Sequence, residues 1–229
     1  MLPRNTGLPE VTVPLPSFGI SATAAAALST WLHIRAESRG PRWQVYLFKP
    51  LTTSLLLLLA ALSPSAHGSR YQLAVALGLA CSLIGDVFLM LPSDRFVPGL
   101  ASFLLAHLAY VVAFTSGVPF STDPAVALPL LAAAAPLLWL LWPRLGRLRL
   151  PVLLYTATIL LMVWQAWGRS WALPTPGSAL AAAGATLFMV SDALLAVNRF
   201  HHSFRSGQAL IMATYVAAQA LIGLSVSTI

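Results

Sequence analysis

Long stretches without a charged side chain alternate with short polar segments along the whole sequence. Six stretches lack Asp, Glu, Lys and Arg altogether: 11–34, 50–69, 96–122, 124–143, 150–168 and 206–229. Two more, 71–91 and 170–197, are interrupted only by Asp86 and Asp192. Each is close to the ~20 apolar residues with which a helix crosses the hydrocarbon core of a bilayer. The pattern therefore predicts eight transmembrane helices.

Proline sets the expected ends of these helices, because it cannot extend a helix past its preceding turn. Breaks of this kind occur at Pro64, Pro92, Pro143 and Pro174. We expect one transmembrane helical domain over residues 20–229, preceded by a flexible tail rich in Pro and Gly over residues 1–19. The expected helices cover 20–35, 44–63, 70–91, 96–115, 124–142, 151–168, 177–197 and 206–227.

The composition agrees with this fold class and excludes a soluble protein. Hydrophobic residues make up 58% of the chain and charged residues 8%, and the mean hydropathy is +0.81. These values lie far from those of soluble domains. The single cysteine, Cys81, excludes an internal disulfide and a thiolate metal cluster. We therefore expect an all-α integral membrane protein, a bundle of eight transmembrane helices.

The basic residues predict the orientation of the bundle. Three arginines, Arg4, Arg70 and Arg169, lie before the first expected helix or in loops that follow even-numbered helices. Nine lie on the opposite side, in loops that follow odd-numbered helices. Short cytoplasmic loops are enriched in Lys and Arg, so the richer side is expected in the cytoplasm and both termini outside it. The net charge of +7 then favours membrane lipids as partners and disfavours nucleic acid. The nine are Arg35, Arg39, Arg42, Arg95, Arg144, Arg147, Arg149, Arg199 and Arg205.

Asp86 and Asp192 are the first candidates for a functional site. A carboxylate in hydrocarbon is costly unless it is paired, hydrated or protonated, so membrane proteins rarely keep one without a use. Both are expected at the same depth, near the cytoplasmic ends of the third and seventh helices. Two carboxylates that face one pocket can supply an acid beside a base, because one can stay protonated while the other is ionised.

The segments around the two aspartates are similar and predict an internal repeat. An Arg-Phe pair follows each aspartate, at 95–96 and at 199–200. The offset, 192 − 86 = 106 residues, is about half of the chain. Four helices per half would give a parallel four-plus-four repeat about an axis along the membrane normal. By the same offset, Tyr155 is the counterpart of Lys49.

Further polar residues are expected in the same half of the membrane. Lys49 is either a lysine that extends its ammonium to the interface or the cationic partner of a carboxylate or a lipid phosphate. His107 and Tyr110, three residues apart, share one helix face, as do Tyr215 and Gln219, four apart. The alternative for each of these is an ordinary hydrogen bond between helices.

Several catalytic signatures are missing from the sequence. It contains no Gly-x-Ser-x-Gly nucleophile elbow, no His-Glu-x-x-His zinc helix and no phosphate-binding glycine loop. We therefore expect neither a metal nor another cofactor, and the two carboxylates remain the main candidates for catalytic groups.

Five elements together resemble the lysoplasmalogenase, or YhhN-like, family of multi-spanning membrane hydrolases. The resemblance covers the expected helices two to four and seven to eight, whereas helices one, five and six match in hydropathy only. The elements are Lys49-Pro50, Gly85-Asp86-x-x-Leu89, His107-x-x-Tyr110, Ser191-Asp192-x-x-Leu195-Ala196-x-Asn198-x-Phe200 and Ala209-Leu210-Ile211-Met212-Ala213-Thr214-Tyr215-x-x-Ala218-Gln219.

This resemblance implies hydrolysis of the vinyl ether bond of a lysoplasmalogen to a fatty aldehyde and a glycerophospho-ethanolamine or -choline. Asp86 and Asp192 would be the general acid and base, in an order that the sequence leaves open. The supporting residues would be Lys49, His107, Tyr110, Asn198, Tyr215 and Gln219. The binding partner would be a lysophospholipid, and a eukaryotic member would reside in the endoplasmic reticulum membrane. Whether the protein forms a homodimer is left open.

Two other functions remain open at this stage. A proton-coupled transporter would also use two buried aspartates in a parallel repeat, with a site near the bilayer midplane. A non-catalytic lipid-binding protein would use them only to bond neighbouring helices. The position of both acids nearer one membrane face favours an enzyme that receives its substrate from one leaflet.

Overall fold

The computed structural model describes residues 15–91, 93, 95–204 and 206–227, and these residues form eight α-helices. Two short 3₁₀ turns, η1 (Trp142–Arg144) and η2 (Gly146–Leu148), connect α5 to α6. The helices are α1 (Leu15–Arg39), α2 (Arg42–Leu62), α3 (Ser69–Met90), α4 (Phe96–Phe114), α5 (Pro124–Leu141), α6 (Arg149–Ala172), α7 (Pro176–Phe200) and α8 (Gly207–Leu224).

The predicted fold class is confirmed, and six helices lie within three residues of their expected ends. By length and hydropathy, seven of the described helices can cross a membrane. The exception is α1, which is rich in Ala, Ser and Thr and is not among the helices that are long and apolar enough. α1 also begins five residues earlier than expected and takes up residues 15–19 of the predicted tail. The rest of that tail, residues 1–14, lies outside the described residues.

α6 extends four residues beyond its expected end, because Arg169 is buried in the bundle instead of lying in a loop. One guanidinium nitrogen of Arg169 donates to the carbonyl of Ser116 at 2.6 Å, and the guanidinium lies 4.6 Å from the ring centre of Tyr71. A carbonyl and an aromatic face thus replace water around this cation. The helix continues one further turn as a result.

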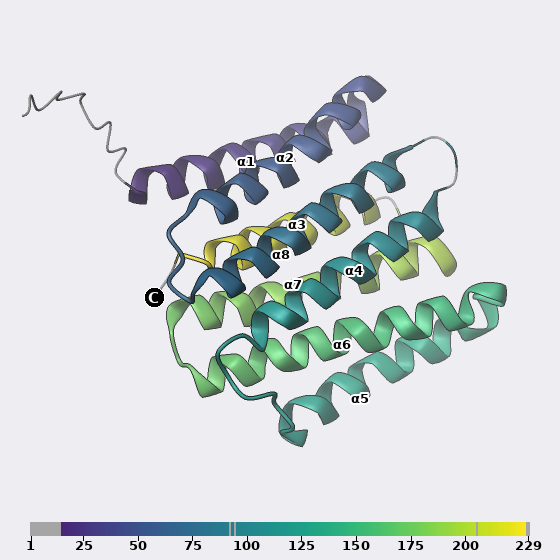
Figure 1. The fold of residues 1–229 in the computed structure, drawn as a ribbon. Coiled ribbons are helices and arrows are strands. Elements are labelled where there is room, and N and C mark those ends of the chain that lie inside the picture. Colours follow the sequence, from purple (N-terminus) through teal and green to yellow (C-terminus); the bar gives the residue numbers. More distant parts are fainter. Residues whose placement is uncertain (1–14, 92, 94, 205, 228–229) are drawn as a thin grey trace, which may run out of the picture.

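The helices run side by side in an elongated bundle (Figure 1). α1 and α2 pack against each other at one edge, and α5 lies at the opposite edge against α6. α3, α4, α7 and α8 occupy the middle, and they contribute most of the fully buried large side chains, including Tyr71, Leu79, Phe188 and Ile222. α5 has only two buried residues, Val126 and Leu141, so most of it faces outward.

Small residues let the central helices approach closely. A side chain at Gly184 of α7 would lie 2.8 Å from the carbonyl oxygen of Ala218 in α8. Gly78 of α3 similarly leaves space for the ring of Tyr110 from α4. Because lipid tails are as apolar as leucine, helices in a membrane associate through such close packing and through hydrogen bonds. The central four helices therefore form the closely packed part of the bundle, and most of the polar residues described below project from it.

Candidate functional site

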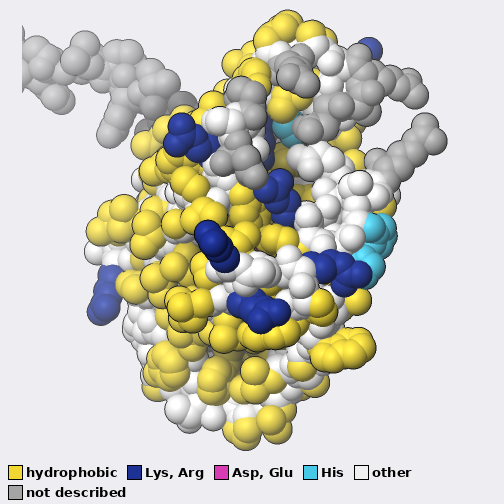
Figure 2. Space-filling model, turned by 90° about the vertical axis from the view of Figure 1, so that its right-hand side faces the viewer, with side chains coloured by type: hydrophobic (Ala, Val, Ile, Leu, Met, Phe, Trp, Pro, Cys, Tyr) yellow, Lys and Arg dark blue, Asp and Glu magenta, His cyan; other side chains and the backbone are white. Residues whose placement is uncertain are grey.

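A polar cavity of about 540 Å³ opens at the end of the bundle where α3 and α7 end and α4 and α8 begin. Seen from that end, several basic side chains lie on the surface around a hollowed region (Figure 2). The cavity contains side chains from α2, α3, α4, α7 and α8. Its polar lining comprises Lys49, Asp86, Arg95, Ser191, Asp192, Asn198, Arg199, Gln208 and Tyr215.

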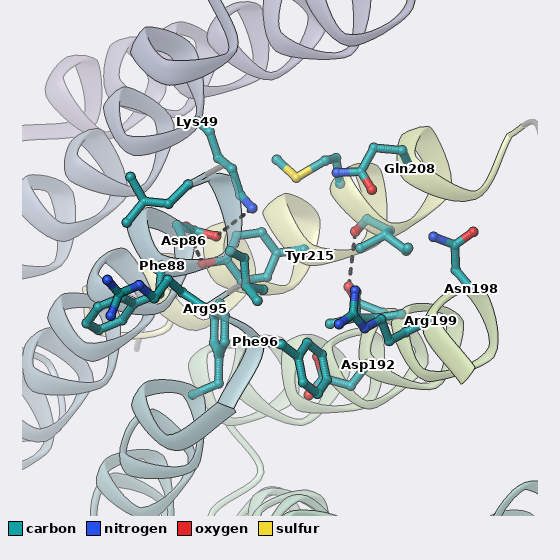
Figure 3. A pocket seen from close by; sticks show the side chains of 17 residues that line it. Lys49, Asp86, Phe88, Arg95, Phe96, Asp192, Asn198, Arg199, Gln208 and Tyr215 are labelled. Carbon is teal, nitrogen blue, oxygen red and sulfur yellow. Dashed lines mark hydrogen bonds and ion pairs between the residues drawn. The ribbon is translucent and has the colours of Figure 1, made fainter. Parts of the chain in front are cut away.

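Both predicted aspartates line this polar cavity, from opposite sides of the close-up view (Figure 3). Asp86 is 1% exposed and projects from the last turn of α3. Asp192 projects from α7 and has a side chain that is 13% exposed. Each carboxylate has its own set of partners, so the two acids share a cavity without being a directly bonded pair.

The partners of Asp86 include a cation. The Lys49 ammonium nitrogen lies 3.5 Å from Oδ1 of Asp86. The hydroxyls of Thr53 and Tyr215 both donate to Oδ2, each at 2.7 Å. Of the two interpretations of Lys49, this geometry favours a cationic partner, since its side chain is only 9% exposed and points to the carboxylate. A counter-ion and two hydroxyl donors therefore surround the carboxyl group of Asp86.

A chain of hydrogen bonds leads from Asp86 into the interior. Gln219 donates from Nε2 to the hydroxyl of Tyr215 at 3.2 Å, and it accepts at Oε1 from the hydroxyl of Tyr110 at 2.6 Å. Gln219 and Tyr110 are fully buried. They lie behind the lining of the polar cavity and fix the orientation of Tyr215, which touches it.

The partners of Asp192 are a phenol and an imidazole. The hydroxyl of Tyr155 donates to Oδ2 of Asp192 at 2.5 Å, and Nε2 of His107 lies 3.6 Å from the same oxygen. His107 is fully buried, with its ring 4.7 Å from that of Phe188 and 5.1 Å from that of Tyr155. A fully buried imidazole surrounded by aromatic rings favours its neutral form. His107 and Tyr110 thus share a helix but serve different aspartates.

The two sets of partners have the arrangement that an internal repeat predicts. Lys49 of α2 contacts Asp86 of α3, and 106 residues later Tyr155 of α6 contacts Asp192 of α7. The second partner comes from α8 for Asp86 and from α4 for Asp192. The α2, α3 and α8 group thus corresponds to the α6, α7 and α4 group. This correspondence supports the predicted four-plus-four repeat and the pairing of Tyr155 with Lys49.

Asn198, another predicted residue, lies at the mouth of the polar cavity. Its Oδ1 accepts from the backbone N–H of Phe204 at 3.4 Å, so it also holds the turn between α7 and α8. Arg199 lies beside it, with its guanidinium 5.0 Å from the ring centre of Phe96. Arg95, at the start of α4, is a further basic residue of the lining.

Thr53, Arg95 and Arg199 were missed as site residues by the sequence analysis. Thr53 comes four residues after Lys49, which places both on one face of α2, and this spacing was the available signal. The two arginines were interpreted only as orientation signals, because loop arginines serve that purpose in most membrane proteins. In the described part of the chain, no three His, Cys, Asp or Glu side chains gather as metal ligands.

A second cavity, here called the apolar compartment, adjoins the polar cavity. It has a volume of about 280 Å³ and lies among α4, α5, α6 and α7. Leu, Ala, Phe, Ile, Val and Met side chains supply almost all of its lining, with Asp192, Tyr155 and Thr156 as its polar members. Asp192 therefore borders both cavities.

Comparisons with known proteins agree on one group of relatives. The model of the YhhN family matches residues 44–226. The uncharacterized membrane protein YhhN of Escherichia coli O6:H1 is 38% identical over 199 residues, which are 86% of this chain and 94% of that protein. No solved structure matches the chain.

Two relatives from animals are named after an enzymatic activity. Lysoplasmalogenase TMEM86B of Sus scrofa is 35% identical over 192 residues, which are 82% of this chain and 77% of that protein. Lysoplasmalogenase TMEM86A of Homo sapiens is 33% identical over 203 residues, which are 82% of this chain and 80% of that protein.

Proposed function

Because the chain belongs to the YhhN family of multi-pass membrane proteins, we propose that it is a lysoplasmalogenase, which hydrolyses the vinyl ether bond of a single-chain phospholipid. The relatives named lysoplasmalogenase support this activity. The observation that carries the proposal is that two carboxylates with chemically different partners line one polar cavity near the end of the bundle.

The reaction needs an acid, an anion and a water molecule. A vinyl ether is hydrolysed when its β-carbon takes a proton, which leaves an oxocarbenium ion on the α-carbon and the ether oxygen. Water adds to the α-carbon and loses a proton, and the resulting hemiacetal breaks its bond to the glycerol oxygen. One vinyl ether and one water thus give one aldehyde and one alcohol, and no nucleophilic side chain is required.

Asp192 is the general acid in this mechanism. It is partnered by a phenol and an imidazole instead of a cation, so its protonated form is favoured in the buried site. Tyr155 donates to Oδ2, which leaves Oδ1 as the oxygen that carries the proton toward the substrate. Its position between the polar cavity and the apolar compartment suits the bond that joins a polar head to an apolar chain.

Asp86 is the anion. Its ion pair with Lys49 and the two hydroxyl donors favour the ionised form. Across the polar cavity, this carboxylate stabilises the positive charge of the oxocarbenium ion, and together with Tyr215 it orients the water that attacks. Asp86 then accepts the proton that the water releases. When the hemiacetal breaks down, this proton passes to the departing glycerol oxygen and the hydroxyl proton of the hemiacetal returns to Asp192, which restores both acids.

The head group of the substrate lies at the mouth of the polar cavity. Arg95 and Arg199 supply positive charge there, and guanidinium groups bind phosphate through paired hydrogen bonds. Asn198 and Gln208 add amide groups beside them. From the nine-to-three count of arginines, we place this mouth on the cytoplasmic side, so that the substrate comes from the cytoplasmic leaflet.

The test is aldehyde release by the purified protein from a vinyl ether lysophospholipid, with the saturated ether analogue as the substrate control. Asp86→Asn and Asp192→Asn are each expected to reduce turnover at least ~100-fold, because general acid–base groups contribute factors of this size or more. Asp123→Asn is the matched control variant, since Asp123 is an exposed helix cap at the opposite end of the bundle.

Thermal unfolding in detergent checks that each variant remains folded. An active Asn variant at either position would exclude the acid–base assignment. A folded wild type that releases no aldehyde would exclude the lysoplasmalogenase, and proton flux into vesicles would then test the transporter.

A further inference from the structure

Most of the apolar compartment extends away from the two aspartates, and only Asp192 and Tyr155 of its lining belong to the acid–base site. It lies to one side of the polar cavity, and four alanines contribute to its lining: Ala133 and Ala134 of α5, and Ala193 and Ala196 of α7. A row of small side chains on two neighbouring helices leaves room that larger apolar residues would fill. The compartment is therefore a space that the packing of these helices leaves open.

The apolar compartment and the polar cavity adjoin each other beside Asp192. Five residues line both of them: Leu89, Phe96, Phe103, Asp192 and Leu195. A molecule with a charged end in the polar cavity can thus extend past Asp192 into apolar surroundings without crossing water. Lysophospholipids have this shape, with one polar head and one hydrocarbon chain.

We propose that the apolar compartment binds the hydrocarbon chain of the lysophospholipid and thereby sets the chain-length preference. The identity of this occupant rests on the proposed function. With the phosphate at Arg95 and Arg199 and the chain in the compartment, the vinyl ether bond lies at the junction, where Asp192 borders both spaces.

The dimensions indicate how much of the chain is enclosed. The lining residues of α6 extend from Val152 to Leu160, which spans about 12 Å of helix. A volume of about 280 Å³ holds about nine groups of the size of a water molecule, a size close to that of a methylene group. The first half of a long chain is therefore enclosed, and its far end extends toward the lipid.

Ala134 marks the deep end of the apolar compartment. It lies seven residues, about 10 Å of helix, before Leu141, which lines the end nearer the basic surface. Ala134 is partly buried, whereas its neighbour Ala132 is exposed and is not part of the lining. A large residue at position 134 is therefore expected to shorten the compartment and leave the polar cavity unchanged.

The experiment compares wild type, Ala134→Phe and the matched control Ala132→Phe. Binding of saturated ether lysophospholipids, which are not cleaved, is measured with chains from short to long. Ala134→Phe is expected to weaken binding of the long chains about tenfold or more relative to the short ones, the range of discrimination that apolar pockets reach. Ala132→Phe is expected to keep the wild-type profile.

Crosslinking gives a second measurement that requires no variant. A lysophospholipid with a photoreactive group in mid-chain is expected to label α5 and α6 near Ala134 and Leu160. Labelling confined to α1 and α2, or an unchanged chain-length profile in folded Ala134→Phe, would overturn the proposal.

The two proposals fail in distinguishable ways. If the protein releases aldehyde but a substitution at position 134 does not change the chain-length profile, the proposed activity stands and binding of the chain in the apolar compartment is excluded. If binding of the hydrocarbon chain depends on position 134 but no aldehyde is released, the chain-binding proposal stands and the proposed activity is excluded.

Discussion

At the scale of single residues, the sequence identified the two acids but not their different surroundings. Asp86 and Asp192 are evident in the sequence because a carboxylate in an apolar run is costly. Thr53 was missed because hydroxyl residues in membrane helices usually bond to their own backbone. Which acid faces an ammonium and which a phenol depends on packing between helices, and residue spacing alone does not determine it.

The ion pair between Lys49 and Asp86 gives a stability prediction. Lys49→Met leaves a buried carboxylate without its counter-ion, which is expected to cost about 3–5 kcal/mol of unfolding free energy. The double variant Lys49→Met/Asp86→Asn removes both charges and is expected to recover most of this loss. Thermal or denaturant unfolding in detergent measures the effect.

Arg144→Met is the control for the ion pair, because Arg144 is an exposed cation near the same end of the bundle. Wild-type stability in Lys49→Met would contradict an ionised Asp86. The mechanism adds that the double variant regains stability but not turnover, which separates the role of the pair in folding from its role in catalysis.

At the scale of helices, the sequence predicted which segments are helical and in which order they follow, but not how the helices pack against one another. Proline breaks and charge-free runs located all eight helices, because helix length in a membrane is set by bilayer thickness. The end of α6 was wrong because Arg169 finds a carbonyl and an aromatic ring instead of water. The apolar compartment could not be predicted, since it arises where small residues of α5 and α7 leave space.

The contact between α7 and α8 is expected to be sensitive to side-chain size at position 184. In Gly184→Val the new side chain would meet the backbone of α8, and overpacking of this kind typically costs about 1–3 kcal/mol. Ala183→Val is the matched control, because Ala183 is exposed on the same helix. Equal melting temperatures of the two variants would contradict the close approach of α7 to α8.

At the scale of the whole molecule, the two ends of the bundle differ. One end presents the basic surface and the mouth of the polar cavity, and both ends of the described chain lie at the other (Figures 1 and 2). Under the proposed function, a lysophospholipid enters the cavity from the leaflet that the basic end faces. The orientation of the bundle therefore decides which leaflet supplies the substrate.

Cysteine labelling tests this orientation. In a Cys81→Ser background, Thr122→Cys lies in the loop before α5 and Ser203→Cys in the turn before α8, and both positions are exposed. A membrane-impermeant maleimide is expected to label Thr122→Cys on intact bacterial spheroplasts and Ser203→Cys only after permeabilisation. The reverse pattern would place the mouth of the polar cavity on the outer face.

The correspondence between the two halves of the chain also has an evolutionary consequence. A symmetric dimer of identical half-length chains must carry the same residue at equivalent positions. In such an ancestor, both carboxylates would face a lysine or both a tyrosine, so the partners of the two acids could not differ. If the two halves arose by duplication, fusion into one gene would have permitted Lys49 and Tyr155 to diverge. Two acids in one cavity with permanently different partners are thus something that a duplicated gene permits and a symmetric homodimer does not.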